Sequence, residues 1–163
     1  MTYTLAPGHF SNKELELFKA SEDAYANIGI TVTQLREKSP QLPDVIVHLS
    51  TDKEIRRLYP ELEKTPGLSL TDRGKLPMHI HFHSGNWNKI PHHLGCEYTD
   101  LIDYQIAVIN HEFAHVLGHD HNSCAAKGEE ADVRQQPSRS LGGCLPTTKV
   151  IFNPKSPKSY VNF

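Results

Sequence analysis

The stretch from Asp100 to Leu117 constrains the fold of this chain most, because its apolar residues recur with the period of an α-helix. When the stretch is projected at about 100° per residue, six apolar side chains form one stripe that we expect to face a core. They are Ile102, Ile106, Ile109, Phe113, Val116 and Leu117. The opposite side carries Tyr104, Ala107 and Val108 together with two histidines, so we expect something other than bulk water to cover it.

The spacing of the histidines in "HEFAHVLGHDH", which begins at His111, is typical of a metal site. His111 and His115 are one helical turn apart and can direct both imidazoles at one ion, with bonds of about 2.0–2.1 Å. In a continued helix His119 would lie about 12 Å along the axis from His111, too far for the same ion. Gly118 permits a bend that ends the helix, and His121 can then return as the third ligand. The sequence predicts one zinc ion per chain, held by His111, His115 and His121.

Three neutral ligands leave a fourth position for water, which is typical of catalytic zinc. Water bound to zinc has a pKa of about 7. Glu112 is placed to take the proton of that water and pass it to a leaving amine. The alternative is a chance cluster in a chain with 11 histidines, but the longer pattern H-E-x-x-H-x-x-G-x-x-H favours a zinc site with Glu112 as its catalytic base.

The same run resembles the extended zinc signature of the metzincin clan of metalloendopeptidases. The stretch "YQIAVINHEFAHVLGHDHNSC" is also similar to small secreted bacterial zincin-like domains; the match covers about residues 98–124. The resemblance implies an α+β, zincin-like single domain over residues 1–163. This domain would have a twisted mixed sheet, an active-site helix beside a second long helix above a cleft, and a small irregular C-terminal subdomain. The upper subdomain would comprise about residues 1–118 and the lower one residues 119–163. The resemblance also implies that an edge strand binds an extended peptide by β-augmentation, and it favours a secreted protein.

The chain departs from the metzincin pattern at one point. Metzincins carry a methionine turn downstream of the third ligand, whereas this chain has only Met1 and Met78, both upstream. We expect Val133 or Leu141 to take the place of that methionine beneath the zinc. The methionine is a hydrophobic base and not a ligand, so its loss need not abolish zinc binding.

Local signals predict further elements in the first half of the chain. The capping boxes "SNKE" and "TDKE" predict two helices. The first ends before Gly29 with Leu15, Phe18 and Tyr25 inward, and the second runs from Asp52 to about Leu58. Runs rich in β-branched or alternating apolar residues predict strands at 30–35, 44–49 and 78–83.

The strand "MHIHFH" (78–83) places Met78, Ile80 and Phe82 on one face and three histidines on the other. His79, His81 and His83 could bind a second metal, but the favoured interpretation is a solvent-facing or cleft-facing strand whose histidines bind no metal. Since this strand comes just before the zinc helix, we expect it to border the cleft and to dock an extended peptide.

Composition limits the partners. The chain has 163 residues and a formal net charge of −2, and its basic residues are scattered, so we expect no nucleic-acid partner. No apolar run approaches the length of a membrane span. The start "MTYTLAPGHF" has neither a basic nor an apolar segment, so we expect no signal peptide. That expectation fits either a cytosolic protein or a mature domain without its leader. Nothing in the sequence predicts an oligomeric state.

The three cysteines allow two interpretations. Cys124 and Cys144 flank a loop and could pair, leaving Cys96 free; equally, all three could be reduced thiols. If Cys96 is free, we expect a buried, idle thiol.

Three functions compete for this site. They are a zinc endopeptidase, a non-catalytic zinc-binding module whose cleft holds a partner protein, and a zinc amidase acting on cell-wall peptide. Glu112 favours hydrolysis over binding alone, because a zinc-holding module has no need of a base there. The sequence therefore predicts a zinc metallopeptidase that hydrolyses peptide bonds.

Overall fold

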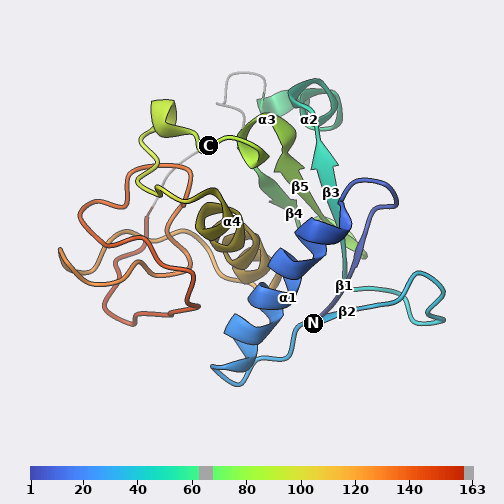
Figure 1. Cartoon of the computed structure of the whole chain (residues 1–163), viewed down its shortest axis with the longest axis horizontal. Coiled ribbons are helices and arrows are strands. Elements are labelled where there is room, and N and C mark those ends of the chain that lie inside the picture. Colours follow the sequence, from blue (N-terminus) through green and yellow to red (C-terminus); the bar gives the residue numbers. More distant parts are fainter. Residues whose placement is uncertain (63–67, 160–163) are drawn as a thin grey trace. The chain divides into compact units, whose positions relative to one another are not determined.

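The structure, a computed structural model, describes residues 1–62 and 68–159 of the chain. It is a mixed α and β protein whose contacts form two compact units, Met1–Asn88 and Lys89–Phe163. Figure 1 shows the elements of both units. The division into an upper and a lower subdomain near residue 118, which the resemblance implies, differs from these two units and stays a prediction. Among the described residues, no helix has the length and apolar character required to cross a membrane.

The first unit contains a five-stranded mixed sheet with the strand order β2-β1-β3-β5-β4. Strand β4 is antiparallel to β5, and the other neighbours are parallel. The mixed sheet that the resemblance implies is thus present, and a strand overlaps each of the three predicted ranges. The strands are β1 (Thr2–Leu5), β2 (Thr33–Gln34), β3 (Val45–Ser50), β4 (Leu70–Asp72) and β5 (Met78–His83). The helices of this unit are α1 (Asn12–Ala26), α2 (Asp52–Leu58), η1 (Pro60–Leu62) and α3 (Ser84–Trp87).

Both predicted capping boxes are present and fix where α1 and α2 begin. The Ser11 hydroxyl accepts from the backbone N–H of Glu14, and the Glu14 carboxylate accepts from the Ser11 N–H at 2.7 Å. Thr51 and Glu54 make the same reciprocal pair, with 2.7 Å between the Thr51 nitrogen and the carboxylate. Each box satisfies N–H groups that the first helical turn leaves without partners.

The core of the first unit lies between α1 and one face of the sheet (Figure 1). Phe18 of α1 is fully buried, and its ring lies 5.8 Å from Tyr3 of β1 and 6.2 Å from Phe82 of β5. Trp87 stacks on Phe82 at 4.8 Å and donates its indole N–H to Glu14. The apolar face of β5 therefore points at α1, and the histidine face of β5 points the other way.

The expectation that an extended peptide docks along strand 78–83 requires correction. Strand β5 lies between β3 and β4, paired with β3 from Met78 to His83 and with β4 from His79 to His81. Both of its hydrogen-bonding edges are therefore occupied, so it cannot accept an added strand by β-augmentation. In the described sheet, the edge strands are β2 and β4.

The second unit contains α4 (Leu101–Val116) and the short helix η2 (His92–Leu94), but no strand in the part of it that the structure describes. Tyr104, Ala107 and Val108 are buried on α4, which confirms that its second face is covered. The predicted core stripe is wrong at one end: Ile102 is 49% exposed. This residue lies in the first turn of the helix.

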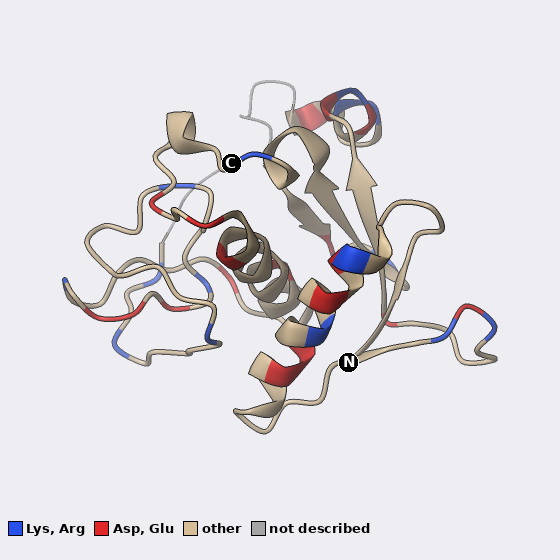
Figure 2. Ribbon diagram, in the orientation of Figure 1, with Lys and Arg blue, Asp and Glu red and all other residues tan. Residues whose placement is uncertain are grey.

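Disulfide and backbone bridges organise the long segment after α4. Cys124 and Cys144 form a disulfide, and Cys96 is a buried free thiol. Of the two interpretations of the cysteines, the structure therefore shows the paired one. Among the residues that the structure describes, lysines and arginines are scattered over α1, α2 and the loops and form no continuous stripe along the ribbon (Figure 2).

Candidate metal centre

Helix α4 presents the first two histidines and then stops abruptly. Asp100 caps its start by accepting from the Asp103 N–H at 2.9 Å. At its end, Gly118 adopts a positive φ of 92°. The N–H groups of Gly118 and His119 bond back to the carbonyls of His115 and Ala114, both at 3.0 Å. This pattern is a Schellman motif, which reverses the chain as the glycine in the sequence predicts.

The reversal brings three imidazoles together. The Nε2 atoms of His111 and His115 are 3.1 Å apart, and the Nε2 atom of His121 is 3.2 Å from each of them. Nitrogen ligands of one tetrahedral zinc ion lie about 3.3–3.4 Å apart, given bonds of about 2.0–2.1 Å. The triangle of nitrogen atoms therefore has nearly the size that one such ion requires.

The other ring nitrogens show how His111 and His115 could serve as metal ligands. His111 donates from Nδ1 to the carbonyl of Val133 at 2.9 Å, and His115 donates from Nδ1 to the carbonyl of His119 at 2.8 Å. Carbonyl oxygens only accept, so the proton of each neutral ring is on Nδ1 and the lone pair is on Nε2. Burial, and then the neighbouring rings of His115 and His121, hold the pKa of His111 well below its usual value. The two Nε2 lone pairs, 3.1 Å apart, could therefore bind one cation together.

A carbonyl partner on Nδ1 is also the usual support for a metal-binding histidine, because it fixes the tautomer and the ring orientation. The partner of His111 is itself held in place. The Val133 N–H bonds to the carbonyl of Ile151 at 2.9 Å. The neighbouring Asp132 carboxylate accepts from the Arg134 guanidinium at 2.6 and 2.8 Å and from the Asn153 N–H at 2.6 Å.

The third histidine is positioned by the last described segment of the chain. The His121 carbonyl accepts from the Ser159 N–H at 3.1 Å, and the Ser123 N–H donates to the carbonyl of Pro157 at 2.9 Å. His119 stays outside the trio: its ring lies 4.3 Å from the ring of Phe152. The structure thus brings together the three histidines that the sequence singles out and places His119 elsewhere, as expected.

Glu112 directly follows the first histidine on α4 and is 2% exposed. His111 is equally buried, at 1% exposure, whereas His115 and His121 are only half-buried. The trio therefore has a buried side, formed by the helix, and a side that water and small molecules can reach. Glu112 is thus a buried carboxyl group on the helix that carries His111 and His115.

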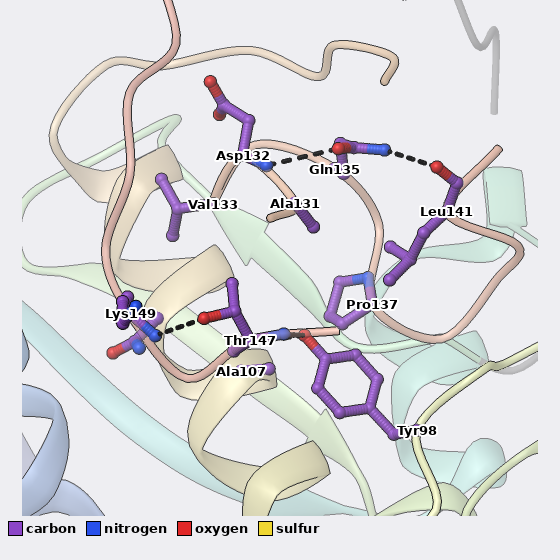
Figure 3. Close-up of a pocket in the computed structure, with 11 residues that line it drawn as sticks. Tyr98, Ala107, Ala131, Asp132, Val133, Gln135, Pro137, Leu141, Thr147 and Lys149 are labelled. Carbon is purple, nitrogen blue, oxygen red and sulfur yellow. Dashed lines mark hydrogen bonds between the residues drawn. The ribbon is translucent and has the colours of Figure 1, made fainter. Parts of the chain in front are cut away.

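The residues expected to replace the methionine turn lie near the trio or in the wall of a small pocket beside it. Val133 supplies the carbonyl that orients His111, and both Val133 and Leu141 are buried and line the pocket (Figure 3). The Gln135 amide joins the two sides of this pocket, since it accepts from the Asp132 N–H at 3.2 Å and donates to the Leu141 carbonyl at 3.0 Å. Val133 thus contributes a buried apolar side chain and the carbonyl that orients His111, and the replacement of the methionine by Val133 or Leu141 stays a prediction.

Sequence reasoning missed the supporting residues, above all the carbonyls of Val133 and His119. Backbone groups leave no signature in a sequence, and Val133 is 22 residues from its partner His111. Asp132 was the available signal, because an aspartate side chain can accept from the backbone N–H two residues on and so anchor a turn; here it accepts from the Arg134 N–H at 2.9 Å.

No protein-family model, no curated protein and no solved structure matches this chain. The function is therefore inferred from the geometry and chemistry of the site itself.

Proposed function

We propose that this chain is a zinc-dependent metallopeptidase of the metzincin type, with His111, His115 and His121 as the ligands of one zinc ion and Glu112 as the catalytic base. The observation that carries the proposal is the triangle of Nε2 atoms, two of which have their tautomers set by backbone carbonyls. Three neutral imidazoles suit zinc among the divalent metals and leave one coordination position free.

Zinc bound there would act as a Lewis acid toward water and toward a substrate carbonyl. The chain's own groups account for the remaining steps. The Glu112 carboxylate accepts a proton from the attacking water and delivers it to the leaving amine nitrogen. Val133 and His119 keep the rings of His111 and His115 oriented throughout, because their carbonyls hold the Nδ1 protons.

The substrate class that we propose is an extended peptide, bound without backbone pairing to β5. The zincin-like fold is part of the same proposal and is supported by the mixed sheet and by the helix that carries the histidine pair. The disulfide fits an oxidising compartment, which supports a secreted protein.

The test compares wild type with Glu112→Gln for zinc content and for cleavage of a peptide library. Glutamine is nearly isosteric and leaves the three ligands intact, so the variant should hold one zinc at this site and lose at least about 100-fold in cleavage rate. Glu16→Gln, at an exposed position of α1, is the matched control and should cleave like wild type.

Unchanged cleavage by Glu112→Gln would remove the glutamate from the mechanism. A wild-type protein that binds zinc but cleaves no peptide would favour the binding module. Cleavage confined to cell-wall peptides would favour the amidase.

A further inference from the structure

A second group of histidines lies in the first unit, on the face of the sheet that α1 does not cover. His48 of β3 is directly opposite His81 of β5 in the parallel register, and His79 is two residues earlier on β5. Their ring nitrogens lie within 4.8 Å of one another. Of the three strand histidines that the sequence singles out, His79 and His81 therefore join His48, whereas His83 does not.

We propose that His48, His79 and His81 bind a second divalent transition-metal ion of the class that prefers imidazole, with zinc as its representative. The strands hold the side chains on one face, because residues two apart on a strand and residues paired across a parallel ladder point to the same side. The Nε2 atom of His48 is 2.9 Å from the Nδ1 atom of His79. The three rings are nearly parallel, with interplanar angles of 18°, 10° and 17°, so binding one ion requires the side chains to rotate until their lone pairs converge at a spacing of about 3.3 Å.

The rings of this group lie close together on one face of the sheet. The rings of His48 and His81 are stacked 4.6 Å apart. Strands β3, β4 and β5 contain no lysine or arginine that would compete with a metal ion (Figure 2).

Neighbouring side chains provide the support that a metal-binding histidine usually has. The Ser50 hydroxyl contacts Nδ1 of His81 at 2.9 Å, which directs the other nitrogen of that ring to the group. On β4, Asp72 is paired with His79, and its carboxylate accepts from the Tyr59 hydroxyl at 3.0 Å. This carboxylate adds negative charge beside the site, which favours a cation.

The group is also accessible. His81 is 5% exposed, whereas His48 and His79 are only half-buried, so an ion and a completing water can reach their nitrogens. His83 has a separate role, because its Nδ1 accepts from the Asn86 N–H at 3.3 Å at the start of α3. It therefore provides a matched control on the same face of the same strand.

The experiment measures bound metal per chain in the full-length protein after chelator treatment and dialysis against Zn²⁺. We expect two ions per chain for wild type and for His83→Gln, and one for His48→Gln and for His79→Gln. Removal of one of the three ligands should weaken the binding of the second ion at least about 100-fold. Co²⁺ absorption spectra should show that the remaining ion in these variants is bound as the first ion is in wild type.

His48 and His79 are half-buried, so we expect both variants to fold, and circular dichroism checks that each of them does. A wild type that binds only one ion, retained in both variants, would overturn the second site and leave the proposed function standing. Two ions retained in both variants would overturn it as well. A single ion that is lost in His48→Gln but retained in His115→Gln would support the second site and overturn the first.

Discussion

At the scale of single residues, the metal centre depends on which of two neighbouring histidines returns after the bend. His121 places Nε2 in the triangle, whereas the ring of His119 lies against Phe152 and contributes only its backbone carbonyl. We expect His121→Ala to weaken zinc binding at least about 100-fold. His119→Ala should retain zinc, because alanine keeps the carbonyl that orients His115. Metal content after dialysis against a weak chelator distinguishes the two variants.

The opposite result, in which His119→Ala loses zinc and His121→Ala retains it, would mean that the chain bends differently after α4. Both variants remove an imidazole of the same size from the same segment. The comparison therefore controls for a general loss of histidine from this part of the chain.

Asp132 gives a second prediction at this scale, on the dependence of stability on pH. Burial raises the pKa of its carboxyl, but the hydrogen bonds from Arg134 and from the Arg134 and Asn153 N–H groups outweigh this effect, and the pKa in the folded protein is lowered. Its stabilising contribution is therefore complete above the unfolded-state pKa of about 3.9 and is lost as the pH falls through the lower folded-state value.

Asp132→Asn should reduce the free energy of unfolding by about 2–3 kcal/mol at pH near 6. This difference from wild type should shrink as the pH approaches about 3. Urea unfolding at the two pH values measures it. Asp23→Asn, whose side chain is 65% exposed, is the control and should show little change at either pH. A difference for Asp132→Asn that grows toward low pH would contradict the assignment.

At the scale of elements, the local signals in the sequence predicted α1, α2 and α4 but not the short helices α3, η1 and η2. The two capping boxes set the starts of α1 and α2, and Gly118 set the end of α4, because each signal acts within one helical turn. Strand pairing depends on residues far apart in the chain. The sequence therefore could not show that β4 occupies the free edge of β5, or that His48 is opposite His81.

The bend at Gly118 can be tested by substitution. Gly118 has a φ of 92°, and a Cβ added there would meet nothing within 4 Å, so Gly118→Ala introduces only backbone strain. Forcing alanine into the left-handed region costs about 1–2 kcal/mol. If alanine instead lets the helix continue, His121 moves away from its partners, so zinc affinity should fall together with stability.

Gly8→Ala is the matched control, since Gly8 also has a positive φ, of 75°, and open space around its Cβ. It should lose similar stability in urea unfolding and keep its zinc affinity in a competition titration. Equal zinc affinity of Gly118→Ala and wild type would show that the bend does not set the position of His121.

At the scale of the whole molecule, the two units are stabilised in different ways. The first has a sheet covered by α1, whereas the described part of the second has one long helix and a long segment without strands. The sequence predicted that this segment would be irregular. It left the cysteine pairing open, because spacing along the chain does not measure distance in space. The supporting carbonyl of Val133 lies inside the loop that the Cys124–Cys144 disulfide closes.

This arrangement makes the disulfide a determinant of metal retention. Cys124 is three residues after His121, and Val133 lies within the closed loop, so the bridge limits the motion of both a ligand and a ligand's support. A loop closed across a sequence separation of 20 residues contributes about 3 kcal/mol through the entropy of the unfolded chain. The double variant Cys124→Ser, Cys144→Ser should therefore release zinc from the His111 site at a clearly lower urea concentration than wild type. Cys96→Ser, which removes the free thiol, should leave that concentration closer to the wild-type value. Zinc release at the same urea concentration in the double variant and in wild type would show that the hydrogen bonds around Asp132 hold the segment without the bridge.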